Sequence, residues 1–294
     1  MFGVTKDPLL LSATIAGLWF LCITAANILF LRKTRRLRPE TSGPRVSVII
    51  PARNEEKNIG GCLRALQRQT YDDFEIIVVD DNSDDKTSRI VDRLAALDGR
   101  IVHVGGRSVP IDWNGKQFAC AQGVEKATGE LLLFTDADVR HAPESIARSV
   151  GQVKGTKAEF LSGYVRQEIR TPGEAIIVPM MYVMTSMLLP LRLLSTSLFP
   201  RWGFAIGQYM LIRKRTLEQI GGFESIKDSL VDDMALSRQV RSSDKRTVFV
   251  DAQKSATCRM YRGYADAFNG IARSVFGAVI RTYPIHIFSM RLQS

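Results

Sequence analysis

Hydrophobic side chains at the beginning of the chain form one long run without interruption. Residues 9–31 contain no charged side chain, and five Lys and Arg residues follow in the linker 32–44. About 20 apolar residues in a helix cross the hydrocarbon core of a bilayer, and basic residues mark the cytoplasmic end. A signal peptide would carry its basic residues before a shorter apolar core, whereas only Lys6, beside Asp7, precedes this run. We therefore predict an uncleaved transmembrane helix at 9–31, a short extracytoplasmic tail at 1–8 and a cytoplasmic remainder; a buried core helix is the alternative.

Beyond the linker, short apolar runs alternate with segments of helical periodicity. The runs that predict strands are residues 46–50, 74–79, 101–104 and 131–134. The segments that predict helices are residues 55–69, 85–97 and 117–127, and a further helix whose first turn contains Pro143. Because the strands are apolar throughout, both faces of their sheet must be covered, as in α/β folds with mostly parallel strands. The pattern predicts one α/β domain over residues 45–255.

Two later segments are too apolar for exposed loops. Residues 176–199 are interrupted by Pro179, Pro190 and Arg192, which argues against a straight transmembrane span. This segment favours a pair of interfacial helices that lie on the bilayer, with a buried core helix as the alternative. The segment 256–294 is amphipathic and predicts a further membrane-associated region.

The composition narrows the class of protein. The chain has 294 residues, 45% of them hydrophobic, which excludes wholesale disorder. Its four Cys are scattered without a C-x-x-C pair, which argues against a zinc module or a disulfide scaffold. The formal net charge of +10 calls for an acidic partner. Since the basic linker beside the apolar helix suits anionic lipid heads, no nucleic-acid partner is expected.

Charged and polar side chains stand directly after three of the predicted strands. They are Arg53, Asn54 and Glu55 after the first strand, Asp80 and Asp81 after the second, and Asp136 and Asp138 after the fourth. Open α/β sheets bind ligands beyond the carboxyl ends of their strands. Carboxylates gathered at one edge repel each other and need a cation or a hydrogen-bonding ligand. A divalent metal that holds a diphosphate would satisfy them, since Mg²⁺ is typically bound by one or two carboxylates plus substrate phosphates.

Each pattern also has a simpler structural alternative. Asn82 and Ser83 could cap the helix that follows the second strand. Asp232 and Asp233 open a helical stretch, where acidic side chains favour the helix dipole. Lys116 could belong to an ordinary turn, although a lysine beside an acidic metal site suits a diphosphate contact. Glycine-rich and Walker nucleotide motifs, the H-E-x-x-H zinc motif and the G-x-S-x-G nucleophile motif are absent from the sequence.

Taken together, the motifs resemble those of a known family. The segments that carry the resemblance are residues 46–56, 76–83, 134–138, 207–213, 220–223 and 232–236, in family order. They are similar to the inverting nucleotide-sugar glycosyltransferases of family 2, which have a GT-A fold. Residues 110–116 together with 134–143 narrow the resemblance to membrane-bound transferases linked to hopanoid and carotenoid pathways.

The resemblance implies a donor site residue by residue. Asp81 would accept a hydrogen bond from the base of a UDP-type nucleotide, and Lys116 would contact the diphosphate. Asp138 would bind Mg²⁺ or Mn²⁺ together with Asp136, which would also meet the ribose or a metal-bound water. The residues that would line the nucleotide pocket are Ala52, Arg53 and Glu55.

The acceptor side is implied in the same way. Asp233 stands three residues before Leu236, at the family's position for the general base, and Asp232 beside it would help to bind the substrate. The Gln-x-x-Arg-Trp signature of processive relatives is missing, which argues against a polysaccharide synthase. Arg262 and Arg273 are candidates for its phosphate-binding arginine.

The expected function is transfer of a sugar, with inversion, to a hydroxyl or carboxyl group of a membrane lipid similar to a hopanoid or carotenoid. A polyprenyl phosphate or a ceramide is the alternative acceptor. An inactive membrane scaffold is a distant alternative, because it would have lost carboxylates that are all present here. The expected location is the cell membrane, with a single span and the catalytic domain on the cytoplasmic face.

Overall fold

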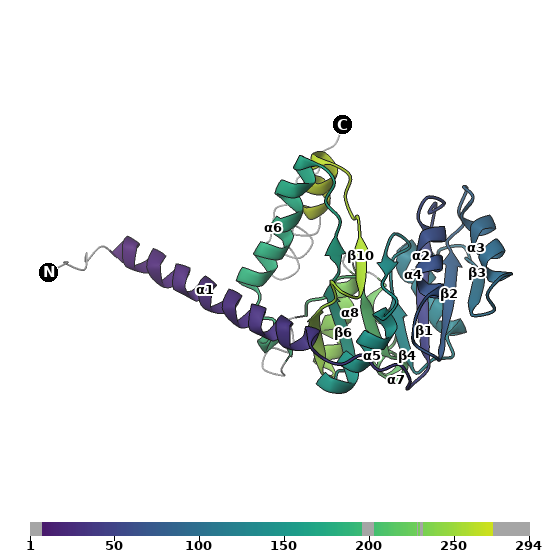
Figure 1. The fold of residues 1–294 in the computed structure, drawn as a ribbon, viewed down its shortest axis with the longest axis horizontal. Coiled ribbons are helices and arrows are strands. Elements are labelled where there is room, and N and C mark those ends of the chain that lie inside the picture. The colour runs from purple at the N-terminus through teal and green to yellow at the C-terminus, as the bar shows by residue number, and fades with distance from the viewer. Residues whose placement is uncertain (1–7, 196–202, 228, 230–231, 273–294) are drawn as a thin grey trace.

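The computed structural model describes residues 8–195, 203–227, 229 and 232–272. Figure 1 shows an α/β body from which one long helix, α1 (Pro8–Arg35), projects. The mixed α/β architecture with a mostly parallel sheet confirms the predicted fold class.

A seven-stranded sheet forms the centre of the body. Its strands, in spatial order, are β3 (Ile101–Gly105), β2 (Phe74–Asp80), β1 (Val46–Ala52), β4 (Leu131–Phe134), β8 (Met210–Arg213), β6 (Phe160–Tyr164) and β9 (Thr247–Asp251). Strand β8 runs antiparallel to both of its neighbours, and the other pairs are parallel. The carboxyl ends of β1, β2 and β4 therefore lie at one edge, beside the start of β8.

Helices cover both faces of this sheet because its strands are apolar on both sides. One face packs against α2 (Ile59–Gln67), α3 (Thr87–Ala95) and α5 (Ser145–Thr156). The other face packs against α4 (Gly115–Lys126), α7 (Lys214–Gln219), the 3₁₀ turn η2 (Phe223–Ile226) and α8 (Asp232–Ser242). Neighbouring residues of β1 alternate between the two cores, with Val48 and Ile50 in the first and Ile49 in the second.

The observed boundaries differ from the predicted ones at the starts of two helices. Helix α2 begins at Ile59 rather than at residue 55, because residues 56–58 form a separate turn in which Asn58 N–H donates to the carbonyl of Glu55 at 2.9 Å. Helix α5 begins at Ser145, so Pro143 precedes the helix instead of lying in its first turn. The carbonyl of Pro143 accepts from Thr70 N–H at 2.8 Å.

A second, small sheet was not predicted from the sequence because its strands are too short to show periodicity. Its order is β5 (Arg140–His141), β10 (Ala256–Cys258) and β7 (Arg166–Gln167). Strand β5 follows Asp138 almost directly, and β7 leads into helix α6 (Pro172–Leu188). This small sheet therefore connects the acidic edge of the large sheet with α6.

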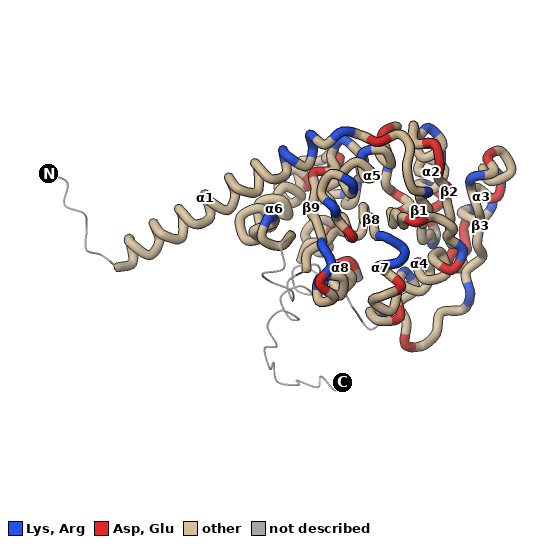
Figure 2. The backbone as a smooth tube through the Cα atoms, turned by 90° about the horizontal axis from the view of Figure 1, so that it is seen from below, with Lys and Arg blue, Asp and Glu red and all other residues tan. Residues whose placement is uncertain are grey.

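Helix α1 is 28 residues long and extends past the predicted span into the basic residues. At about 1.5 Å per residue, it is long enough to cross a bilayer. Within the described residues it is the one helix that is long and apolar enough to do so. Figure 2 shows Lys and Arg gathered where α1 meets the body, whereas the projecting part lacks them.

Helix α6 continues through Pro179 up to Leu188, so this proline does not end the helix as the sequence suggested. A 3₁₀ turn, η1 (Leu193–Ser195), follows it. The predicted pair of helices is thus one α-helix and one short turn as far as the structure describes it, and residues 196–199 lie outside the described residues.

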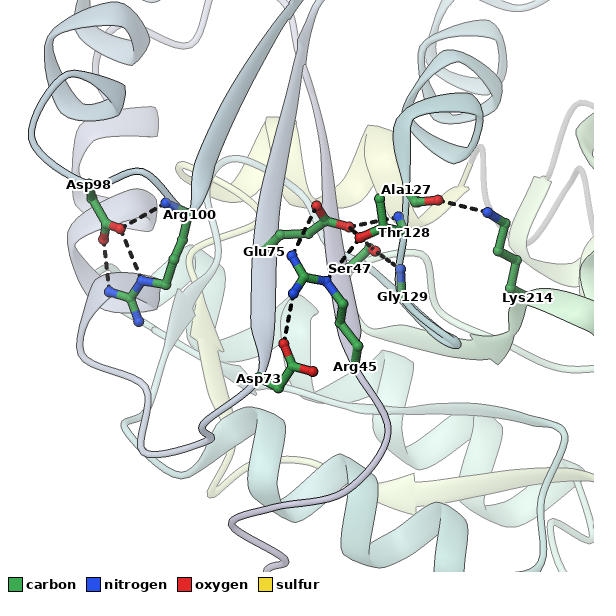
Figure 3. A network of polar contacts seen from close by, with 10 residues as sticks. All are labelled: Arg45, Ser47, Asp73, Glu75, Asp98, Arg100, Ala127, Thr128, Gly129 and Lys214. Atoms are coloured by element: carbon green, nitrogen blue, oxygen red, sulfur yellow. Dashed lines mark hydrogen bonds and ion pairs between the residues drawn. The ribbon is translucent and has the colours of Figure 1, made fainter.

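The amino-terminal edge of the large sheet holds a network of polar contacts, drawn in Figure 3. The carboxylate of Glu75 accepts from Ser47 Oγ at 2.6 Å and from Thr128 N–H at 2.8 Å, and Arg45 lies 3.6 Å away. Burial alone would raise the pKa of Glu75, but the hydrogen bonds from Ser47 and Thr128 outweigh it and lower the pKa. This network belongs to the edge opposite the predicted site.

Candidate active site

Asp81, the residue directly after β2, lies largely buried at the acidic edge. Its N–H donates to the carbonyl of Ala52 at 2.8 Å, which aligns the ends of β1 and β2. The guanidinium of Arg53 is 3.6 Å from Asp81 Oδ2, and these side chains are 61% and 8% exposed. A Cβ on Gly115 would come within 2.8 Å of the same oxygen. Only glycine at the start of α4 therefore lets the carboxylate approach the helix, whose dipole favours a negative charge there.

The turn that carries Arg53 and Glu55 is braced from the β2 side. Glu55 N–H donates to Thr87 Oγ1 at 2.8 Å, and Asp84 N–H donates to Asn54 Oδ1 at 2.9 Å. The carboxylate of Glu55 accepts from Asn58 Nδ2 at 2.7 Å. The nucleotide-pocket residues proposed from the sequence thus lie on a fixed turn.

The capping alternative for Asn82 and Ser83 is wrong, because α3 begins at Thr87 and its cap position is Lys86. Instead, Asp80 closes this turn: its carboxylate accepts from Ser83 N–H at 3.0 Å and from Ser88 Oγ. The two neighbouring acids therefore have different surroundings. Asp80 is engaged in the turn, whereas Asp81 faces Arg53 and the start of α4.

Lys116 and Asp136 meet directly. Lys116 is the second residue of α4, and its N–H is held by the N-cap side chain of Asn114 at 3.0 Å. Lys116 Nζ lies 2.6 Å from Asp136 Oδ1, and both side chains are partly exposed, at 40% and 28%. The ammonium group therefore sits beside the acidic motif, as the sequence predicted.

Asp138 lies deeper than Asp136. Its Oδ1 is buried and has no hydrogen-bond partner in the described part of the chain. Burial, and next the nearby charge of Asp136, raise the pKa of Asp138, while a contact with the Cys258 thiol opposes the shift. A buried carboxylate oxygen without a partner is costly, and a divalent cation is a ligand that would satisfy it.

The donor set suits a metal that is shared with a substrate. Among the described residues no group of three or more His, Cys, Asp or Glu side chains could hold an ion by itself. Asp136 and Asp138 provide two carboxylates, and Mg²⁺ commonly takes its remaining ligands from waters and substrate phosphates. The residues present therefore fit a metal–diphosphate complex better than a permanently enclosed ion.

Asp233 reaches the same region from α8. Its carboxylate accepts from Gly207 N–H at 2.8 Å and from Met234 N–H at 2.7 Å. A Cβ on Gly207 would lie 3.7 Å from Asp233 Oδ2 and 3.6 Å from Lys116 Nζ. Gly207 therefore lies next to both the Asp233 carboxylate and the Lys116 ammonium group.

The stripe of α8 that follows Asp233 packs inward, since Leu236 and Val240 are fully buried. Asp232 begins the same helix. Arg262 is exposed beside residues 264–272, and Arg273 lies outside the described residues.

Two polar groups behind the site were missed from the sequence. His141 contacts Thr135 Oγ1 at 3.0 Å and Ser145 Oγ at 2.9 Å, and burial lowers the pKa of His141 to about 4. Gln208 Nε2 lies 3.3 Å from Cys258 Sγ, and Gln208 Oε1 accepts from Gln167. Gln208 and His141 both stood inside motif segments, which was the available signal, but their contacts depend on the small sheet.

These features belong to a known class of protein. A model of the family described as glycosyl transferase family 2 matches residues 47–221, more than half of the chain. The chain therefore belongs to glycosyl transferase family 2, as the motif order indicated.

Individual relatives share part of the chain. A 4,4'-diaponeurosporenoate glycosyltransferase of Staphylococcus haemolyticus is 39% identical over 108 residues, covering 35% of this chain and 28% of that protein. Glycosyltransferase AglE of Haloferax volcanii is 32% identical over 134 residues, covering 45% of this chain and 43% of that protein. The matched segments thus span less than half of these relatives.

Solved structures share the fold. A mannosyltransferase of Pyrobaculum calidifontis in complex with GDP-Man and Mn²⁺ has a TM-score of 0.59 at 22% identity, covering 88% of this chain and 75% of that one. Staphylococcus aureus TarS 1–349 in complex with UDP-GlcNAc has a TM-score of 0.53 at 17% identity, covering 80% and 66%. At these identities the likeness establishes the GT-A fold.

Proposed function

We propose that the chain is an inverting glycosyltransferase that moves a sugar from a nucleoside diphosphate sugar to a membrane lipid. The observation that carries this proposal is the convergence of Lys116, Asp136 and Asp233 beside Gly207, next to the unpartnered oxygen of Asp138. In this proposal Lys116 and a metal held by Asp136 and Asp138 stabilise the leaving diphosphate, and Asp233 is the carboxylate base.

The donor half of the proposal rests on the edge formed by β1, β2 and β4. Asp81, which contacts Arg53 and Ala52, would accept a hydrogen bond from the nucleotide base. A UDP-type donor is favoured by the motif resemblance, and the titles of two structural neighbours name GDP-Man and UDP-GlcNAc. Lys116 would stabilise the diphosphate as it leaves, when the negative charge on the diphosphate grows.

Asp136 and Asp138 would hold Mg²⁺ or Mn²⁺ against the diphosphate. When bound, such an ion stabilises the leaving group as a Lewis acid. The mannosyltransferase neighbour was solved with Mn²⁺, which supports this choice of cofactor. Asp138 contributes the deeper oxygen, and Asp136 is the carboxylate that Lys116 also contacts.

Asp233 would act as the general base. Two backbone N–H groups hold its carboxylate in one orientation. A base opposite the leaving group activates the acceptor for a single displacement, which inverts the anomeric centre. Asp232 would assist substrate binding.

The acceptor proposal rests on the apolar surface beside the site. Helix α6 and residues 264–272 pack together through Val178, Tyr261 and Ala267. The large apolar side chains that they leave exposed are Ile176, Met180, Val183, Leu188, Tyr264 and Phe268. Such a surface next to α1 fits an amphipathic layer on a bilayer, and the carotenoid acid in the name of the first relative supports a hydroxyl or carboxyl acceptor on an apolar lipid.

We place the protein in the cell membrane with α1 as a single span and the domain on the cytoplasmic face. The basic end of α1 joins the body, which matches the charge asymmetry of membrane proteins. Protease added to intact cells should then leave residues 45–294 uncut, and cleavage there would reverse the topology.

A transfer assay tests the function. Membranes that contain the protein are incubated with a panel of radiolabelled UDP and GDP sugars, and label in extracted lipid is measured. Panels of acceptors separate hopanoid or carotenoid lipids from polyprenyl phosphates and ceramides. We expect label from one donor in an apolar lipid, and a rate of labelling lower by about 10²–10⁴ in membranes with Asp233→Asn. Equal label in both membranes would contradict the proposal.

A further inference from the structure

One side chain of α1 differs from the rest of its projecting part. Asn27 is 1% exposed, although the neighbouring residues Ile28 and Leu29 are 43% and 67% exposed. A fully buried amide inside an apolar helix needs partners, because an unpaired polar group in such surroundings is costly.

All three partners of Asn27 are backbone groups at the end of α6. Asn27 Nδ2 donates to the carbonyls of Ser186 at 2.9 Å and Leu189 at 2.7 Å. Its Oδ1 accepts from Leu191 N–H at 3.0 Å. These bonds use both amide hydrogens and the amide oxygen.

The hydrogen bonds from Asn27 give partners to carbonyl groups at the carboxyl-terminal end of α6. The last carbonyls of a helix have no partner within the helix, and next to lipid no water replaces them. Helix α6 ends in Leu188 with Leu189 at its cap position, and no basic residue lies in its last turn. Asn27 therefore supplies the carboxyl-terminal cap of α6 from another helix.

Further contacts extend the junction toward the body. Phe30 and Leu31 of α1 pack against Leu191 and Leu194 in a small core of their own. Thr34 Oγ1 accepts from Asp251 N–H at 3.4 Å, at the end of β9. The last third of α1 is thus part of the folded domain.

Helix α6 is in turn connected to the site. Tyr182 Oη donates to the carbonyl of Val165 at 2.8 Å, directly before β7. Gln167 of β7 donates to Gln208 at 3.0 Å, and Gln208 follows Gly207. The position of α6 and the position of Gly207 beside Asp233 are therefore set by one continuous set of contacts.

We propose that Asn27 is a positioning residue for the lipid acceptor: by capping α6, it joins the apolar span to the surface along which the acceptor reaches Asp233. This inference rests on the proposed function. Helix α1 would then help to position the lipid acceptor in addition to anchoring the protein in the membrane.

The test uses the full chain in detergent micelles or lipid nanodiscs. Asn27→Leu removes the cap but keeps an apolar helix, and Ser12→Leu is the matched control, since Ser12 bonds only within its own helix, to the carbonyl of Leu9. The readouts are the Kd for UDP with Mn²⁺, the KM for the lipid acceptor, and hydrogen exchange at residues 186–191.

We expect Asn27→Leu to raise the acceptor KM roughly tenfold, as loss of about one well-made interaction does, and to leave the UDP Kd unchanged. Exchange at 186–191 should become faster, and Ser12→Leu should match the wild type. Asn27→Gln, which keeps the amide, should recover part of the acceptor KM. An unchanged acceptor KM, or an equal loss of UDP affinity, would overturn the proposal. If the wild type transferred sugar to no lipid, the proposed function would fail, and unchanged exchange would still refute the cap separately.

Discussion

Both edges of the large sheet carry carboxylate side chains, but the hydrogen bonding of these carboxylates differs between the two edges. At the amino-terminal edge, the Glu75 carboxylate is satisfied by Ser47, Thr128 and Arg45 (Figure 3). At the carboxyl-terminal edge, one oxygen of Asp138 is buried without a partner in the described chain. The surroundings lower the pKa of Glu75 and raise the pKa of Asp138. A buried carboxylate with hydrogen-bond partners stabilises the fold, whereas a buried carboxylate oxygen without a partner indicates where a ligand would bind.

The largest effect should come from Asp233→Asn at the carboxyl-terminal edge. Without a base, kcat should fall by about 10²–10⁴, while donor affinity stays the same because the base acts in the chemical step. Single-turnover transfer and UDP titration measure the two quantities. Asp232→Asn is the control and should retain substantial turnover. If Asp232→Asn lost turnover and Asp233→Asn did not, Asp232 rather than Asp233 would be the general base.

Asp138→Asn should abolish the gain in UDP affinity that Mn²⁺ or Mg²⁺ provides. The amide lacks the charge that the ion requires, and calorimetric titration of UDP with and without metal measures the loss. Asp244→Asn is the matched control: Asp244 is exposed and has φ of 55°, a conformation that Asn adopts readily. If metal-dependent UDP binding persisted in Asp138→Asn, the metal would be bound by residues other than Asp138.

Glu75→Gln should destabilise the fold and spare the chemistry. Losing the charged acceptor costs about 1–3 kcal/mol of unfolding free energy, and urea unfolding in detergent measures it. Because the folded-state pKa of Glu75 lies below its usual 4.5, its contribution is present at neutral pH and lost on acidification through the folded-state pKa. The difference in unfolding free energy between wild type and Glu75→Gln should therefore shrink as the pH falls below 4.5 and through the lower folded-state pKa. If this difference in unfolding free energy did not change with pH, the loss of stability would come from packing rather than from the charge of Glu75.

The smallest effect should come from Asp73→Asn in the same network. Asp73 pairs with Arg45 at 2.8 Å, but these side chains are 53% and 44% exposed. Exposed ion pairs contribute about 0–1 kcal/mol, so unfolding free energy and transfer rate should stay near wild type. A loss as large as that of Glu75→Gln would mean that Arg45, rather than burial, governs the network.

Much of this arrangement could be read from the sequence because the signals are local. The apolar strand at 131–134 and the acids after β1, β2 and β4 were placed correctly, since strand periodicity and strand ends depend on neighbouring residues. The family motifs predicted that Lys116 and Asp136 serve one donor site, but their direct contact at 2.6 Å was not predicted. The roles of the individual site residues remain predictions.

What could not be predicted depends on contacts between distant segments. The small sheet of β5, β10 and β7 joins two-residue and three-residue strands, which have no periodicity of their own. The capping of α6 by Asn27 links residues more than 150 positions apart. The start predicted for α2 was too early, because residues 56–58 form a turn before the helix begins at Ile59.

The single reversed strand, β8, has a consequence for the order of folding. Its pairing Phe134 with Met210 closes a chain loop that contains α5, β6 and α6. Contacts of such high sequence separation form late, because the loop entropy must be overcome first. Strands β1, β2 and β3 pair over only 28 and 25 residues, whereas the β1–β4 pair spans 85 residues and the pairing of Phe134 with Met210 spans 76. The part of the edge that carries Arg53 and Asp81 should therefore assemble before Gly207 reaches Asp233. We expect a chain stalled at this stage to lack transferase activity, because the carboxylate of Asp233 is not yet beside Lys116.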